Sequence, residues 1–323
     1  MIELQTAWGW PVALYLFLGG LGGGMFLAAT VLGFVRRKRH RRARAVSFWA
    51  AFACVAVGLL SLLAEVVLPC RALLVWQSFS HLSSWMALGA WGALAALVLF
   101  FATAFLTTKK TSRLLSIVWE AHPGLRGKVR TACSLAGLAP ALFLAFYTGM
   151  LLRAAPGVPF WHSALLPCLF VVSALGAGTN AVTALVVLTG GARKVSRRRR
   201  RIVAGIVMGA AVAEGVLLFL FVATMLQGGS GLLPTQQLAA QTSAEMLLSG
   251  GCAVPFWGLV VAGGLVAPFV LSALSLFVRG KVGWRILVFG ALLTLVGDCT
   301  LRFLFLHVGA SADYVGQALL AIL

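Results

Sequence analysis

Residues 10–44 read WPVALYLFLGGLGGGMFLAATVLGFVRRKRHRRAR. The stretch opens with an apolar run over residues 10–35 that carries no charged side chain, and it closes with nine residues of which seven are Lys or Arg. A helix needs about 20 residues to cross a hydrocarbon core of about 30 Å. This part of the sequence therefore predicts a transmembrane helix that ends at a strongly basic membrane surface.

The composition of the whole chain follows the same pattern. Of its 323 residues, 61% are hydrophobic and only 10% are charged, and the mean hydropathy is +1.00. Soluble domains carry about 25% charged residues, because their surface must face water. The soluble class is therefore excluded. A closed β-barrel is excluded as well, because the apolar runs are continuous and do not alternate at every second residue.

We predict an all-α polytopic membrane protein with eight transmembrane helices in two four-helix bundles, forming one integral membrane domain over residues 1–323. Each helix corresponds to an apolar run long enough to span the bilayer. The helices are expected at about 10–35, 46–68, 85–106, 131–153, 162–189, 202–226, 250–278 and 286–308.

The basic residues predict the orientation of these helices. Of the 26 Lys and Arg residues, 23 lie in loops 36–44, 109–130, 193–201 and 279–285. Eight spans place all four loops on one side of the membrane. Positively charged loops are retained in the cytoplasm, so both termini are expected outside it. Topology and contact with anionic lipid account for these basic runs, and no nucleic-acid partner is predicted.

Metal and haem sites are not expected in this chain. The six cysteines are scattered without any C-x-x-C pair, which excludes a four-Cys iron–sulfur cluster. A b-type haem between helices needs two histidines well inside the bilayer. The five histidines are instead expected in the basic loops or at the outer edge: His40, His81, His122, His162 and His307.

Ionisable and phenolic side chains inside a membrane are candidates for function. At about 1.5 Å per helical residue, Tyr15, Glu65 and Tyr147 are expected roughly 6–9 Å below the outer surface. Arg71 and Ser84 belong to the loop above them. Such a set can hydrogen-bond both oxygens of a quinol head group, and Glu65 can pass the released protons to water. The alternative is an ion pair of Glu65 with Arg71, with both tyrosines as interfacial belt residues.

A second polar group is expected near the middle of the membrane. Glu214 and Asp298 lie near the centres of the sixth and eighth spans. Asp298 and Arg302 are four residues apart, so they share a helix face and can neutralise each other. The group is either a structural ion pair or a proton path that links Glu214, Asp298, Arg302 and Asn180 towards the cytoplasm.

Several stretches together resemble one family of membrane subunits. They are WGWPVALYLFLGGLGGG (8–24), FYTGMLL (146–152), PFWHSALLPCLFVVSALGAG (159–178), FWGLVVAGGLVAP (256–268) and LRFLFLHVG (301–309). This combination resembles the NrfD/PsrC family of polysulfide reductase-type complexes. EVVLPCRA (65–72) and SSWMALGAW (83–91) resemble a segment of the related dimethyl sulfoxide reductase anchor subunits.

The resemblance implies an eight-helix, haem-free, quinone-binding subunit with partners outside the membrane. The implied partners are an iron–sulfur protein with four [4Fe–4S] clusters and a molybdopterin catalytic subunit. By position, Tyr15, Glu65 and Tyr147 match the quinone contacts of the family, and Arg71 matches its loop arginine. The anchor-type pattern often has His or Asp followed by Leu-Gly-Arg-Pro, whereas this chain has Glu65, with Val67 and Leu68 in place of Gly and Arg.

The expected function is therefore oxidation of menaquinol, or reduction of a quinone, by the membrane anchor of a respiratory oxidoreductase in the bacterial cytoplasmic membrane. A secondary transporter built around Glu214 and Asp298 is the alternative from another class. It predicts helices broken at mid-depth, with the Gly-rich stretch 19–24 as one such break; the same glycines also suit close helix packing. A passive anchor and a quinone-coupled proton pump also stay open. So do the terminal substrate, the quinone type and the direction of electron flow.

Overall fold

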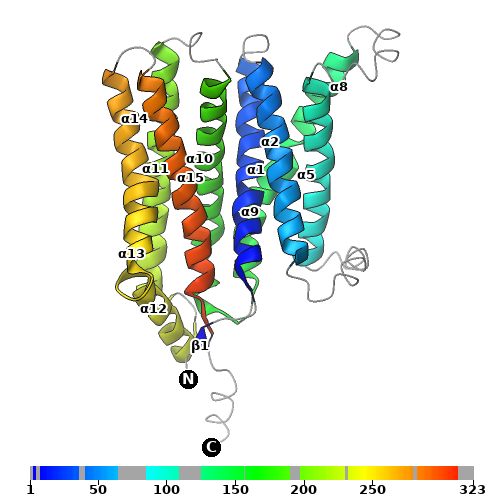
Figure 1. Cartoon of the computed structure of the whole chain (residues 1–323). Helices are drawn as coiled ribbons and strands as arrows, with labels where there is room; N and C mark the ends of the chain where they lie inside the picture. The colour runs from blue at the N-terminus through cyan, green and yellow to red at the C-terminus, as the bar shows by residue number, and fades with distance from the viewer. Residues whose placement is uncertain are drawn as a thin grey trace, which may run out of the picture.

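The computed structural model describes residues 3–4, 8–35, 41–64, 85–108, 125–155, 157–189, 197–229, 232–278 and 282–311. Within these residues, eight helices are long and apolar enough to cross a membrane. They stand side by side along a common direction (Figure 1). The predicted number of spans and the predicted all-helical class are therefore confirmed.

The first four spans form one bundle. In this bundle α1 packs against α2 and α9, and α5 packs against the same two helices. The fourth span consists of two helices that meet at a turn on Gly137. The elements are α1 (Trp10–Val35), α2 (Arg41–Ala64), α5 (Trp85–Thr107), α8 (Leu125–Ala136) and α9 (Leu138–Arg153).

The last four spans form the second bundle (Figure 1). Here α10 contacts α11 and α15, and α14 contacts α11 and α15. The two bundles meet where α10 packs against α1 and α9. The elements are η2 (Pro159–Trp161), α10 (Leu165–Leu188), α11 (Arg197–Leu226), α13 (Ala253–Pro255), η4 (Phe256–Val266), α14 (Ala267–Phe277) and α15 (Val282–His307).

Helix α1 is the centre of the molecule. Its most apolar window is 72% buried, whereas that of every other span is at most 50% buried. Glycines allow this, because an added Cβ on Gly24 would overlap the Ala174 carbonyl of α10, and one on Gly23 would lie 2.5 Å from the Ala141 carbonyl oxygen of α9. The helix runs unbroken through stretch 19–24. These glycines therefore serve close packing, not a helix break.

The seventh span changes its pitch along its length. Residues Phe256–Val266 form a π-helix between α13 and α14, in which hydrogen bonds reach five residues along the chain. Gly264 in this segment packs directly on Gly297 of α15, and a Cβ added to Gly264 would come within 2.8 Å of the Gly297 Cα. The span is continuous from Ala253 to Phe277, slightly inside the predicted range of 250–278.

An additional helix, α12 (Pro234–Leu248), follows the sixth span and was not predicted from the sequence. Proline begins it, and the Gln236 side chain accepts a hydrogen bond from the Leu233 amide at 3.1 Å. It lies below the second bundle, near the paired strands β1 (Glu3–Leu4) and β2 (Ala310–Ser311) (Figure 1). The Ser243 hydroxyl accepts a hydrogen bond from the Ala310 amide at 3.1 Å, which ties α12 to β2.

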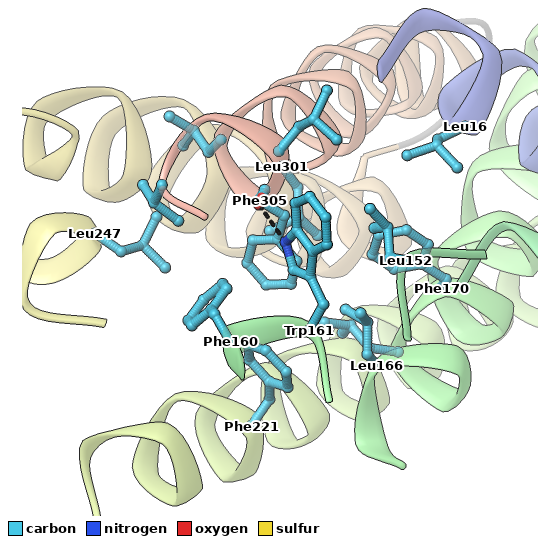
Figure 2. Packing of buried hydrophobic residues seen from close by; sticks show 14 of the residues in the cluster. Leu16, Leu152, Phe160, Trp161, Leu166, Phe170, Phe221, Leu247, Leu301 and Phe305 are labelled. Carbon is cyan, nitrogen blue, oxygen red and sulfur yellow. Dashed lines mark hydrogen bonds between the residues drawn. The ribbon is translucent and has the colours of Figure 1, made fainter. Parts of the chain in front are cut away.

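A buried aromatic cluster joins the second bundle to the start of α1. The Trp161 indole Nε1 donates a hydrogen bond of 2.8 Å to the Phe305 carbonyl of α15 (Figure 2). Phe305 also stacks on Phe221 of α11 at a centroid distance of 5.1 Å. Trp161 also stacks on Trp8, with ring centroids 5.4 Å apart. Three segments far apart in the sequence are thereby held at the end of the molecule that carries β1 and β2.

Most of the described Lys and Arg residues lie at the opposite end, the exceptions being Arg153 and Arg302. Helices α2 and α11 begin there with Arg41 and Arg197, and Arg285 lies in the first turn of α15. Figure 1 shows these helix ends, together with α8, away from β1 and α12. This separation follows the expected topology, in which every basic loop lies on one side. Which side faces the cytoplasm stays a prediction from the charge pattern.

Candidate functional site

Two buried tyrosines lie near each other in the first bundle, at the end of the molecule that carries β1. Tyr15 lies five residues into α1, and Tyr147 lies six residues before α9 ends at Arg153. Both side chains are buried, belong to the same core cluster and interact electrostatically with each other. The structure thus places two of the side chains that the sequence assigns to a quinol site near each other, on neighbouring helices at the same end of the bundle.

Glycines on neighbouring helices make room for the two phenols. A Cβ on Gly89 of α5 would overlap the Tyr147 ring, whose Cε1 atom would be only 2.6 Å away. A Cβ on Gly58 of α2 would lie 3.5 Å from Cδ2 of Tyr15. Tyr147 also stacks on Phe143 one turn earlier, with centroids 5.5 Å apart. The ring positions are therefore set by α1, α2, α5 and α9 together.

The remaining members of the expected quinol site are Glu65, Arg71 and Ser84, and they lie outside the described residues. Their proximity to Tyr15 and Tyr147 stays a prediction. The last described residue of α2 is Ala64, and near that end the Ser61 hydroxyl donates to the Pro11 carbonyl at 2.9 Å. This hydrogen bond holds the end of α2 against the start of α1, close to Tyr15.

A second polar cluster lies inside the second bundle. The Ser173 hydroxyl of α10 donates to Asp298 Oδ1 at 2.9 Å and accepts from Arg302 Nη1 at 2.7 Å. Arg302 also donates to the Phe170 carbonyl at 3.4 Å, and its guanidinium carbon lies 4.5 Å from the centre of that ring. Among the described contacts, Ser173 therefore bridges the Asp298 carboxyl and the Arg302 guanidinium, a role that sequence reasoning missed.

Glu214 of α11 completes this cluster. Its carboxyl lies beside Asp298 and Ser173 and interacts with the charge of Arg302. The exposed fractions of Glu214, Asp298 and Arg302 are 3%, 4% and 2%. Asp298 Oδ2 and Arg302 Nε have no hydrogen-bond partner within the described part of the chain. Three helices thus enclose two carboxyls and one guanidinium, and two polar atoms of this cluster can still form hydrogen bonds.

Asn180 extends this polar seam along α10 and α15. Its Nδ2 donates to Thr294 Oγ1 at 3.4 Å. Thr294 is one helical turn before Asp298, and Asn180 is two turns after Ser173, so both lie towards the basic end. All of the residues predicted for the mid-membrane group therefore lie in one interface. Thr294 had a sequence signal, because it stands four residues before Asp298 on the same helix, whereas α10 has no charged residue at helical spacing from Ser173.

Neither of two pockets lined by the described residues contains the tyrosines. One is an apolar groove of about 440 Å³ between α11 and the seventh span, whose lining includes Leu218, Phe256 and Trp257. The other is a small polar pocket at the basic end. In the described part of the chain, no group of three or more His, Cys, Asp or Glu side chains is arranged to hold a metal ion.

The fold and these two polar groups define a multi-pass membrane protein with ionisable groups buried between its helices. The family described as "Polysulphide reductase, NrfD" matches residues 3–312, which is nearly the whole chain. This chain therefore belongs to the NrfD polysulphide reductase family, whose members are membrane subunits of reductase complexes.

Individual relatives agree with this assignment. The protein is 26% identical to one of the polysulfide reductase polypeptides of Wolinella succinogenes over 314 residues, covering 94% of both proteins. It is 27% identical to protein NrfD of Escherichia coli K12 over 336 residues, covering 94% of this chain and 95% of the relative. One of the selenate reductase subunits of Mesobacillus selenatarsenatis is 26% identical over 212 residues, covering 58% of this chain and 50% of that protein.

Proposed function

We propose that this chain binds quinol and passes its electrons to an iron–sulfur subunit of a respiratory reductase complex. The observation that carries the proposal is the pair of buried phenols, Tyr15 and Tyr147, which lie near each other between α1, α2, α5 and α9. Two phenol groups supply both donors and acceptors for a ring that carries two oxygens. Membership of a family of reductase-complex subunits supports the same function.

The chemistry assigns a role to each residue of the site. Tyr15 and Tyr147 hydrogen-bond the head group, and Arg71 and Ser84 cap it from the loop. Oxidation of one quinol to quinone releases two electrons and two protons. The electrons go one at a time to the partner, and Glu65 accepts the protons in turn and passes them to water, which makes it the catalytic base. Reduction of a quinone would use the same residues in the opposite direction.

The proposed location follows from the predicted orientation, and the proposed partners follow from the family. Because basic ends are retained in the cytoplasm, the tyrosine end faces the outside of the bacterial cytoplasmic membrane. We assign menaquinol as the substrate, and a four-cluster ferredoxin-like protein and a molybdopterin catalytic subunit as the partners on that side. Two of the relatives are named as parts of a polysulfide reductase and of a selenate reductase, which supports an assembly of several subunits.

We assign a separate role to the cluster in the second bundle, as a proton path. Glu214, Asp298, Arg302 and Asn180 lie on one seam that leads from mid-depth towards the basic end. Asp298 Oδ2, which has no hydrogen-bond partner among the described residues, can accept a proton within this cluster. Glu214→Gln is expected to lower the number of protons moved per electron in sealed vesicles, while quinol oxidation continues. An unchanged ratio would leave the cluster with a structural role only.

The quinol site is tested in the complex purified from the native membrane. Glu65→Gln is expected to lower menaquinol oxidation by a factor of about 100 or more, because a base is lost, while the complex still assembles. Tyr147→Phe keeps the ring packing and removes only the hydroxyl, so we expect a rise in KM for quinol. Glu245→Gln is the matched control, because Glu245 is an exposed carboxylate on α12.

The outcomes separate the alternatives. Unchanged quinol oxidation in both Glu65→Gln and Tyr147→Phe would refute the site and favour a passive anchor. Uptake of a solute by the chain alone in liposomes would favour a transporter. The described helices include no break at the Gly-rich stretch that this alternative expects, since α1 is continuous over Trp10–Val35.

A further inference from the structure

A small polar pocket lies at the basic end of the first bundle, at the opposite end from the tyrosines. It is enclosed by α1, α2, α5 and α8. Thr30 of α1, Arg44 of α2, Thr107 of α5 and Arg130 of α8 all line it. Nothing in the proposed quinol chemistry or proton path uses these residues.

Two threonine hydroxyls in this pocket lack a partner. Thr30 and Thr107 are only 2% and 1% exposed, and their Oγ1 atoms have no hydrogen-bond partner among the residues that the structure describes. A helical threonine usually donates to the carbonyl four residues earlier, as Thr103 does to Leu99 at 2.7 Å. A buried hydroxyl without a partner is costly. The two hydroxyls therefore indicate a ligand that accepts hydrogen bonds.

The charge on the pocket wall is positive. Arg44 is buried and donates from Nη1 to the Gly33 carbonyl at 3.4 Å. A Cβ on Gly33 would lie 3.1 Å from that nitrogen, so the absence of a side chain lets the guanidinium reach α1. Arg130 is half-buried on the facing helix. Two guanidinium groups thus approach one pocket from different helices.

Further arginines raise the local positive potential. Arg126 interacts as a like charge with both Arg41 and Arg130, and it donates to the Leu106 carbonyl at 2.8 Å. A nearby like charge disfavours the charged form of each of these groups, and an anion beside them favours it. The described residues around this pocket therefore bring several positive charges close to one another.

We propose that this pocket binds a phosphoryl oxyanion, with Thr30, Thr107, Arg44 and Arg130 as its hydrogen-bond donors. Guanidinium groups and hydroxyls are the side chains that suit phosphate oxygens. The inner space of about 30 Å³ has room for about two oxygen-sized atoms. It therefore takes the end of a single phosphate group and excludes a nucleotide or a quinone ring. The phosphate comes from a phospholipid head group or from the free ion.

The test uses the full chain, delipidated in a neutral maltoside detergent. Two probes are added separately: phosphatidylglycerol, with retained lipid counted by native mass spectrometry, and inorganic phosphate, with the unfolding temperature measured. We expect the double variant Thr30→Val/Thr107→Val to bind the effective probe about a hundredfold more weakly, because two hydrogen bonds to a charged group are lost. Thr183→Val is the matched control, since that buried hydroxyl already bonds within its own helix at 2.8 Å.

Two arginine variants give a second comparison. Arg44→Gln is expected to weaken binding at least as strongly as the double threonine variant, whereas Arg42→Gln, an exposed arginine two residues away, leaves it unchanged. Thr107→Ser keeps a hydroxyl and is expected to restore binding relative to Thr107→Val. Binding of the lipid alone identifies a head-group site, and binding of phosphate alone identifies a free-ion site. Wild-type binding of both probes by the double threonine variant, or equal losses in Arg42→Gln and Arg44→Gln, would overturn the proposal.

Discussion

Ser173→Ala is the substitution that most directly probes the buried polar cluster of the second bundle. The Ser173 hydroxyl makes two hydrogen bonds to ionisable side chains, one to Asp298 Oδ1 at 2.9 Å and one from Arg302 Nη1 at 2.7 Å. Alanine removes both without adding volume. Asp298 Oδ2 and Arg302 Nε already lack partners among the described residues, so nearby groups offer little compensation.

An upper and a lower limit can be set on the free energy of unfolding that Ser173→Ala is expected to lose. A hydrogen bond to a charged group contributes about 1.5–3 kcal/mol, and two such bonds give about 3–6 kcal/mol. Hydrogen bonds between membrane helices average only about 0.6 kcal/mol, because side chains of the unfolded state in the membrane find other partners. We expect a value near the lower end of the first range, about 3 kcal/mol, because Ser173 is fully enclosed by α10 and α15.

The assay is reversible unfolding in mixed detergent micelles, with the free energy of unfolding as its readout. Ser47→Ala is the matched control. Ser47 and Ser173 are both 0% exposed, but the Ser47 hydroxyl bonds only to the Ala43 carbonyl of its own helix, at 3.0 Å. Its loss should therefore cost under about 1 kcal/mol. Equal losses of stability in the two variants would show that the Ser173 bridge between Asp298 and Arg302 contributes no net stability.

Two further predictions concern packing. Gly24→Ala is expected to destabilise the chain by about 1–3 kcal/mol, since its Cβ would lie 2.8 Å from the Ala174 carbonyl carbon. Gly209→Ala, with open space around it, should be neutral or slightly stabilising in the same unfolding assay; a Gly24→Ala chain as stable as wild type would contradict the close crossing of α1 and α10. Trp161→Phe should lower the unfolding temperature of the chain in detergent. It leaves the Phe305 carbonyl, in the last turn of α15, without its 2.8 Å donor and costs about 1–3 kcal/mol; an unchanged unfolding temperature would mean that another donor replaces the indole.

The positions of the spans followed from the sequence because membrane insertion depends on local composition. The length of an apolar run decides whether it can cross the bilayer. Helix α1 accordingly begins and ends at the predicted residues, 10 and 35. Other helices begin earlier than predicted, because helical geometry continues into basic residues beyond the apolar run, as at Arg197 in α11. Helix α12 was missed because its mean hydropathy is low, although Pro234 and Gln236 are typical of a helix start.

The candidate site was predicted only in part. Tyr15 and Tyr147 could be paired from depth alone, because residues at equal distances from helix ends lie at equal heights. Ser173 could not be identified in this way, since its role depends on which face of α10 meets α15. The arginine-lined pocket was also invisible in the sequence. Its donors come from four helices, and only packing shows that the Thr30 and Thr107 hydroxyls lack partners among the described residues.

The sequence by itself determined that this chain crosses a membrane eight times, with its basic loops together at one end, because hydrophobic length and charge act through the solvent that each segment meets. The tertiary structure decided which helices touch and which polar groups share a partner. Those features depend on rotation about each helix axis, and a uniformly apolar helix carries almost no signal of that rotation. For that reason the roles of the α1 glycines and of the Ser173 hydroxyl could be identified only from the residues that they contact.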